Sequence, residues 1–137
     1  ESPNFNKWLN FTCDNNENKK SVLLALLYMV LSNRYDWQLF IEITGEGATG
    51  KSVLTDICMQ MVGLDNVISL NLNNLDNPKE RYPIKDKLLI ICPDQPSYKI
   101  IGSGLKAITG GDLIRVEPKY KDPLNLLIEV EELNVGV

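Results

Sequence analysis

Residues 45–52 read Gly45-Glu46-Gly47-Ala48-Thr49-Gly50-Lys51-Ser52. Two glycines that bracket four residues and are followed by Lys and Ser form the pattern of a phosphate-binding loop. Because glycine adopts backbone conformations closed to other residues, consecutive N–H groups in such a loop can turn inward around phosphate oxygens. A helix that begins near Lys51 adds the positive end of its dipole. The stretch therefore predicts a strand, a phosphate-binding loop and a helix, in that order.

The side chains of this stretch have predicted roles. Lys51 is expected to reach the β- and γ-phosphates of a nucleotide as a point charge, and the Ser52 hydroxyl to bind magnesium. We expect residues 45–53, with Val53 included, to contact the nucleotide. The alternative is a glycine-rich turn that merely links strand to helix, with Lys51 solvated. The flanking sequence favours the phosphate-binding loop, since a buried strand precedes it and an amphipathic helix follows.

The strand before the loop is predicted over residues 39–44, an apolar run that Gly45 stops. The helix after the loop is predicted from apolar residues at positions i, i+3, i+4 and i+7, and it ends at Gly63. These four residues are Leu54, Ile57, Cys58 and Met61.

Similar patterns predict the other elements. We expect a helix that includes residues 22–31 and ends near Asn33, strands at 88–92, 113–116 and 126–130, a short helix at 103–109, and a loop over the asparagine-rich residues 71–78. Alternation of strands and helices predicts an α/β fold with a sheet that is at least partly parallel. Ligands of such sheets bind at the carboxyl ends of the strands.

Composition limits the function classes. The 137 residues fit one domain, and 14 basic against 18 acidic residues argue against a protein that coats nucleic acid by bulk charge. Three cysteines and no histidine give no zinc spacing, and they fit a reducing cytoplasm. The longest apolar run, residues 22–31, is too short to cross a membrane. The chain starts at Glu1 rather than Met, and we expect it to be a fragment of a longer polypeptide.

A P-loop ATPase also needs an acidic group near magnesium, at the end of a neighbouring hydrophobic strand. Asp94 follows the apolar residues 88–92 and Pro93, and we expect it to hold a metal-bound water. The alternative is that Asp94, with Pro93 and Pro96 beside it, starts a turn. Gln95 occupies the position of a second acid that activates the attacking water in many such ATPases. Glutamine can orient water but cannot accept a proton near neutral pH.

Residues 105–123 read Leu-Lys-Ala-Ile-Thr-Gly-Gly-Asp-Leu-Ile-Arg-Val-Glu-Pro-Lys-Tyr-Lys-Asp-Pro. Together with the glycine-rich loop and the Asp94 strand, this segment resembles the helicase part of phage and plasmid primase-helicases, a branch of superfamily 3 within the AAA+ class. In that family a Lys-x-x-x-Gly-Gly-Asp segment lies between the acidic strand and a third motif. It ends in a basic hairpin that lines the central channel of a hexamer.

The resemblance assigns residues to two motifs. The middle motif matches Lys106, Thr109, Gly110, Gly111 and Asp112, and the hairpin tip matches Lys119, Tyr120 and Lys121. A Lys-Tyr-Lys tip offers two phosphate contacts and one ring for stacking. Proteins commonly bind single-stranded nucleic acid through such contacts. The alternative is an ordinary solvated hairpin.

The resemblance implies an AAA+-like P-loop NTPase with a mostly parallel central sheet flanked by helices. It implies ATP and Mg²⁺ as ligands, single-stranded DNA as partner, a homo-hexamer in the full-length protein and no membrane association. We expect an N-terminal helical segment over residues 1–36 and an ATPase core over residues 37–137. The expected location is the cytoplasm of a bacterial or archaeal host, with a phage or mobile element as the source.

Two features differ from the family pattern. The third motif ends a strand with a polar sensor, commonly asparagine, yet residues 126–132 read Leu-Leu-Ile-Glu-Val-Glu-Glu before Asn134. The family also inserts an arginine finger into the site of a neighbouring subunit, and the arginines of this chain are Arg34, Arg81 and Arg115. The sequence does not identify one of them as the finger. Two other functions stay open. The first is a small-molecule kinase, but the few arginines and the Gly-Gly-Asp segment argue against it, because a kinase needs an arginine-rich lid. The second is a non-hydrolysing module, in which nucleotide stabilises the fold or the chain assembles on DNA without being a motor.

Overall fold

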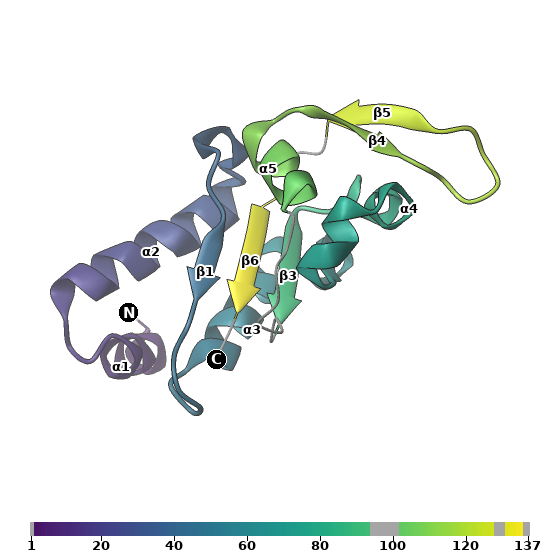
Figure 1. Cartoon of the computed structure of the whole chain (residues 1–137). Helices are drawn as coiled ribbons and strands as arrows, with labels where there is room; N and C mark the ends of the chain where they lie inside the picture. The colour runs from purple at the N-terminus through teal and green to yellow at the C-terminus, as the bar shows by residue number, and fades with distance from the viewer. Residues whose placement is uncertain (1, 94–101, 128–130, 136–137) are drawn as a thin grey trace.

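The computed structural model describes residues 2–93, 102–127 and 131–135 of the chain, which adopt an α/β fold (Figure 1). The helices are α1 (Pro3–Thr12), α2 (Glu17–Ser32), α3 (Lys51–Val62), α4 (Pro78–Arg81) and α5 (Ser103–Gly110). The strands are β1 (Ile41–Ile43), β2 (Val67–Ser69), β3 (Leu89–Pro93), β4 (Leu113–Val116), β5 (Leu124–Leu127) and β6 (Glu131–Val135). Short 3-10 turns include η3 (Leu72–Asp76).

The main sheet has the strand order β1-β6-β3-β2, and all of its strands run parallel. Its last strand in the sequence, β6, therefore lies between β1 and β3 (Figure 1). The register aligns Asn134 with Glu42 on one side and with Cys92 on the other. Because the strands are parallel, the carboxyl ends of β1, β6 and β3 meet at one edge of the sheet.

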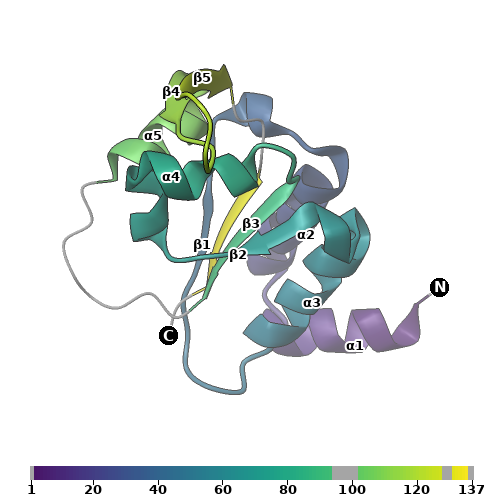
Figure 2. The same ribbon diagram turned by 90° about the vertical axis from the view of Figure 1, so that its right-hand side faces the viewer.

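Strand β3 supplies both faces of the sheet with core residues, because successive side chains of a strand point to opposite faces. Leu89 and Ile91 pack with residues of α2 and α3, whereas Ile90 and Cys92 pack with residues of η3, α5 and β4. Figure 2 shows the strands between these two layers. An unbroken apolar strand is what a sheet covered on both faces requires.

The second sheet is the antiparallel hairpin of β4 and β5, which pairs Leu113 with Leu127 and Val116 with Leu124. Figure 1 shows that it projects from the body of the molecule beside α4. Its contact with the core is made by Ile114 and Val116, both of which are buried.

The structure confirms the predicted helix after the glycine-rich loop, the helix near residues 103–109 and the strands near 88–92 and 113–116. The strand before the loop is shorter than predicted. Helix α2 includes the predicted residues 22–31 and begins at Glu17, where the Asn16 side chain accepts a hydrogen bond from Lys19 N–H at 3.1 Å and so caps the helix.

The predictions for residues 71–78 and 126–130 were wrong in part. The asparagine-rich stretch forms η3, where Asn71 and Asn74 cap each other's backbone, and it runs into α4. The C-terminal strand predicted at 126–130 overlaps β5, which begins at Leu124 and pairs with β4, whereas β6, which begins at Glu131 in the other sheet, was not predicted. Residues 128–130 lie outside the described part of the chain. Helix α1 lies within the expected N-terminal helical segment but was not predicted as a separate helix, and strand β2 was not predicted.

None of the helices within residues 2–93, 102–127 and 131–135 has the length and apolar character needed to cross a bilayer. Cys13, Cys58 and Cys92 are all buried. Burial raises the pKa of the Cys58 thiol to about 11, which disfavours its reactive thiolate form.

Candidate functional site

The glycine-rich loop joins the carboxyl end of β1 to the first residue of α3, Lys51. Figure 1 shows this loop at the lower end of β1, near the ends of β6 and β3. The register brings Ile43, Val135 and Pro93 to the same level at these ends. The loop thus occupies the edge of a parallel sheet at which ligands of α/β proteins bind.

Gly50 is the residue at which the loop turns into the helix. Its φ of 94° lies in the left-handed region that disfavours residues with a side chain. The Gly50 carbonyl oxygen then accepts the first helical hydrogen bond, from Leu54 N–H at 3.0 Å. The N–H groups of the first turn of a helix have no partner within the helix. The start of α3 therefore offers amide donors and a positive dipole end to an anion.

Lys51 turns back over its own loop. Its ammonium donates hydrogen bonds of 2.6 Å to the carbonyl oxygens of Gly45 and Glu46, and it lies 3.4 Å from Thr49 Oγ1. The Thr49 hydroxyl in turn donates to the Glu46 carbonyl at 2.8 Å. The loop therefore wraps around a positive charge, at the point where the helix also presents its positive end.

Ser52 is exposed in the first turn of α3, next to Lys51. Strand β3 ends at Pro93, which immediately precedes Asp94 in the sequence. Asp94 and Gln95 lie outside the described residues, so their predicted positions near the glycine-rich loop stay predictions. Among the residues that are described, no cluster of three acidic or cysteine side chains has the geometry of a metal site.

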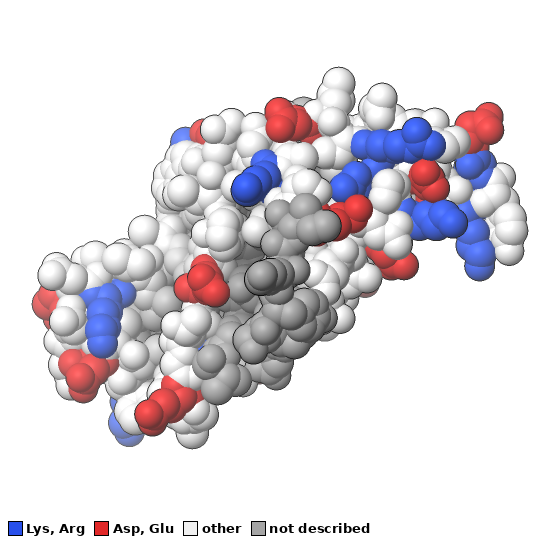
Figure 3. All heavy atoms as spheres, in the orientation of Figure 1, with Lys and Arg blue, Asp and Glu red and all other residues white. Residues whose placement is uncertain are grey.

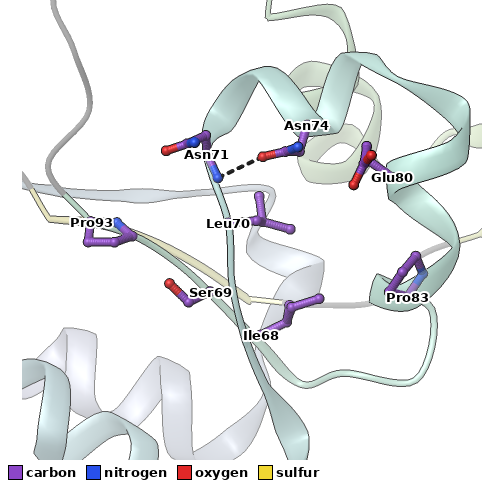
Figure 4. A pocket seen from close by; sticks show the side chains of 8 residues that line it. All are labelled: Ile68, Ser69, Leu70, Asn71, Asn74, Glu80, Pro83 and Pro93. Atoms are coloured by element: carbon purple, nitrogen blue, oxygen red, sulfur yellow. Dashed lines mark hydrogen bonds between the residues drawn. The ribbon is translucent and has the colours of Figure 1, made fainter.

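A polar hollow of about 420 Å³ lies beside the ends of β2 and β3 (Figure 4). Ser69 and Pro93 line it from the two strands, and Asn71, Asn74 and Glu80 line it from the next turns. The Asn71 N–H donates to Asn74 Oδ1 at 2.9 Å, so part of this polar set already stabilises η3. The asparagine-rich sequence had suggested only a loop here.

The predicted middle motif lies at the other end of β1. Lys106, Thr109 and Gly110 of α5 line a hollow of about 660 Å³ together with residues 38–40, which precede β1. Gln38 Nε2 donates to the Gly110 carbonyl at 2.9 Å. The glycine-rich loop begins at the carboxyl end of β1, whereas Gln38 lies before the amino end of the same strand. The structure therefore does not bring Lys106 or Thr109 to the glycine-rich loop. Gly111, with φ 73°, ends α5 in the left-handed conformation, and Asp112 follows it.

The predicted basic tip does lie at the end of the β4–β5 hairpin. The Tyr120 side chain is 93% exposed, and its φ of 63° is unusual for a residue other than glycine. The Lys119 ammonium lies 5.3 Å from the centre of the Tyr120 ring. A fully exposed ring flanked by Lys119 and Lys121 is available for stacking. Figure 3 shows lysines and arginines gathered at this end of the molecule.

Lys79 of α4 lies beside this tip, and the sequence alone did not predict its position there. It lines a hollow of about 530 Å³ together with Glu117, Lys119, Tyr120 and Lys121. The carboxylate of Glu117 accepts a hydrogen bond from Arg115 Nε at 3.2 Å. Lys79 was overlooked because it is distant in sequence from the hairpin and follows a stretch without periodicity.

Hydrogen bonds to backbone carbonyl oxygens hold α4 against the hairpin. The Glu117 N–H donates to the Pro78 carbonyl at 2.9 Å. Arg81 donates from Nη1 to the Arg115 carbonyl at 3.0 Å and from Nε to the Leu75 carbonyl at 2.6 Å. Arg81 thus connects η3, α4 and β4.

This geometry defines an α/β protein in which a glycine-rich loop with an inward-turned lysine connects a parallel strand to a helix. The chain belongs to a family of unknown function, DUF5906, which matches residues 43–130. The matched residues include the glycine-rich loop, β3 and the hairpin, whereas α1 and α2 precede them.

Solved structures of the NrS-1 C-terminal region share the fold. An A form apo structure of this region aligns with a TM-score of 0.68 at 15% identity, and it covers 96% of this chain. A second A form structure gives 0.66 at 14% identity, and a further apo structure gives 0.68 at 15%. This chain spans about a third of those chains, 32%, 31% and 32% of their length.

Proposed function

We propose that this chain is the nucleotide-binding core of a P-loop ATPase of the superfamily 3 helicase type, which couples ATP hydrolysis to movement along single-stranded DNA. The observation that carries the proposal is the Lys51 ammonium held over the glycine-rich loop, 2.6 Å from the carbonyls of Gly45 and Glu46. A loop closed around a cation at the start of a helix suits the phosphates of a nucleotide.

The strand order supports the same class. Strands β1 and β3, which precede the loop and Asp94, lie on either side of β6. A third strand between them supplies a position for the polar sensor of the resembling family. Asn134 of β6 stands in register with Cys92 and Glu42, close to the carboxyl edge.

Each residue of the site has a proposed role. Backbone N–H groups of residues 45–53 bind the phosphates, and Lys51 neutralises charge on the β- and γ-phosphates. Ser52 and Asp94 hold Mg²⁺, which would neutralise the charge that develops during phosphoryl transfer. The exposed Ser52 hydroxyl beside Lys51 fits that role, because magnesium prefers oxygen ligands. Gln95 orients the attacking water, and its amide cannot take the proton.

Single-stranded DNA is the proposed partner at the hairpin. Lys79, Lys119 and Lys121 contact phosphates, and the exposed Tyr120 ring stacks on a base or sugar. By the family resemblance, the full-length protein works as a homo-hexamer in the cytoplasm of a bacterial or archaeal host that carries a phage or mobile element.

The arginines favour an ATPase over a kinase. A small-molecule kinase closes an arginine-rich lid over the transferred phosphoryl group. Here Arg34 pairs with Asp36 at 2.8 Å, Arg115 pairs with Glu117 at 3.2 Å, and Arg81 donates to backbone carbonyls. The second rival, a nucleotide-binding module without turnover, is favoured by Gln95 in the position of the second acid.

Steady-state ATP hydrolysis with and without Mg²⁺ and single-stranded DNA tests the proposal. Turnover that needs Mg²⁺, rises with DNA and disappears in Lys51→Ala supports it. ATP binding without turnover favours the non-hydrolysing module, and phosphoryl transfer to a small molecule favours the kinase. A chain that binds no nucleotide would remove the proposal altogether.

A further inference from the structure

A hollow of about 470 Å³ lies between the glycine-rich loop and the N-terminal helix α1. Residues 47–53 form one side of it, and Trp8 and Phe11 of α1 form the other. Their positions three apart place both rings on one face of the helix. The hollow therefore combines a loop with the geometry of a phosphate site and two aromatic side chains.

Helix α1 reaches the loop because Gly50 has no side chain. A Cβ atom at position 50 would lie 3.0 Å from Trp8 Nε1 and would collide with Thr12 Oγ1. Trp8 also packs on Phe5, with ring centres 5.5 Å apart, and α1 buries Leu9. The aromatic side of the hollow is thus held in place against the loop.

Two polar atoms at this contact are buried without hydrogen-bond partners in the described part of the chain: Trp8 Nε1 and Thr12 Oγ1. Buried polar groups in proteins are nearly always paired, and unpaired ones need an explanation. Both atoms lie against Gly50 at the loop. Trp8 also lines the hollow, whereas Thr12 does not.

The apolar rim of the hollow is open to solvent. Phe11 is 69% exposed and Val53 is 45% exposed, and both line the hollow. Single exposed apolar residues are normal on protein surfaces. Here, however, an exposed aromatic ring and an exposed apolar side chain border the same hollow as Lys51 and Ser52. That combination suits a ligand with a planar apolar part and a charged part.

We propose that Trp8 and Phe11 bind the nucleobase of the nucleotide whose phosphates lie on the glycine-rich loop. The inference rests on the proposed function and adds the site of the base to it. Stacking on an aromatic ring uses the π-face that every base carries. Such a site holds ATP and GTP with similar affinity. It adds nothing to the affinity for a triphosphate that lacks a base, which the glycine-rich loop binds alone.

Calorimetric titration of the chain with ATP and with inorganic tripolyphosphate, both with Mg²⁺, tests the proposal. Phe11→Ala should weaken ATP binding about tenfold, the size expected for one stacked base, and leave tripolyphosphate binding unchanged. Phe40→Ala is the matched control, because Phe40 is also exposed but lines a different hollow. Equal ATP affinity of Phe11→Ala and the wild type would overturn the proposal.

Trp8 provides a second readout that does not depend on Phe11. The chain has two tryptophans, Trp8 and Trp37, so Trp37→Phe leaves Trp8 as the reporter. ATP should change its fluorescence, whereas tripolyphosphate should change it far less. Equal fluorescence changes or equal affinities for the two ligands would overturn the base site and leave the phosphate loop standing. If neither ligand binds, the proposed function itself fails.

Discussion

The Lys51 ammonium lies 2.6 Å from the carbonyl oxygen of Gly45, six residues before it in the chain. This contact closes the glycine-rich loop around a positive charge. In the proposed complex the phosphates take the place of the carbonyl oxygens as partners of the ammonium.

Lys51→Ala should therefore abolish tight ATP binding and leave the fold intact. A charge-assisted hydrogen bond contributes roughly 1.5–3 kcal/mol, so ATP affinity should fall at least about tenfold. Calorimetry measures the affinity, and circular dichroism checks the fold. Lys85→Ala is the control, since this exposed lysine pairs with Asp86 away from the loop. Unchanged ATP affinity in a folded Lys51→Ala protein would contradict the proposed function.

Asp94→Asn should retain much of the affinity for ATP and lose magnesium-dependent turnover, because the proposed carboxylate mainly serves the metal. Gln95→Glu is the informative partner variant. Higher turnover with glutamate would show that the natural chain lacks a base at this position. Turnover of Asp94→Asn that equals the wild type would remove Asp94 from the metal site.

Replacing both Lys119 and Lys121 with alanine should weaken single-strand binding for all sequences alike. The slope of log affinity against log salt should fall by about 0.7 for each lysine that no longer neutralises a phosphate. Lys79→Ala should lower it by about a further 0.7, because Lys79 lines the same hollow. Lys7→Ala on α1 is the control. The measurement is a fluorescence anisotropy titration at several salt concentrations, under conditions where sedimentation shows an assembled ring. A wild-type slope in the triple variant would contradict the DNA site.

Arg81→Met should destabilise the fold by about 1–3 kcal/mol, because the carbonyl oxygens of Leu75 and Arg115 are then without their charged donor. It should also weaken DNA binding, since the Arg81 guanidinium helps to hold α4, and with it Lys79, beside the hairpin. Urea denaturation gives the change in stability. Arg115→Met, which breaks only an exposed pair with Glu117, should change stability by less than about 1 kcal/mol. Equal effects of the two variants would contradict the role of Arg81.

Asp76 should make stability depend on acid pH. Burial raises the pKa of its carboxyl, but hydrogen bonds from Gly104 N–H, Ser103 and Gly102 N–H outweigh burial and leave the pKa below its ordinary 3.8. A lowered pKa means that the folded chain binds fewer protons, so this stabilisation is present above about pH 4 and is lost as pH falls further. Asp76→Asn should cost stability at pH 7 and progressively less at pH 4 and pH 3 in urea titrations. A cost that stays constant with pH would contradict the predicted ionisation.

The glycine-rich loop and α3 were predictable because their determinants are local. Gly50 permits the left-handed turn, and the hydrogen bond from Leu54 N–H to its carbonyl spans only four residues. The apolar spacing that follows needs only the period of a helix. The buried run of β3 was predictable for a similar reason, since a strand covered on both faces is apolar throughout.

Long-range pairing decided the rest. Residues 124–127 and 131–135 form two strands in different sheets, and only their partners, β4 for the first and β1 and β3 for the second, decide to which sheet each belongs. The alternation of side chains in a sequence predicts a strand, but it does not predict which neighbouring strand forms hydrogen bonds with its backbone N–H and C=O groups. In the same way, the sequence by itself determined the loop, its lysine and the Lys-Tyr-Lys tip. Only the tertiary structure placed Lys79 beside that tip and Trp8 against Gly50, because these contacts form between side chains and backbone that the chain separates by many residues.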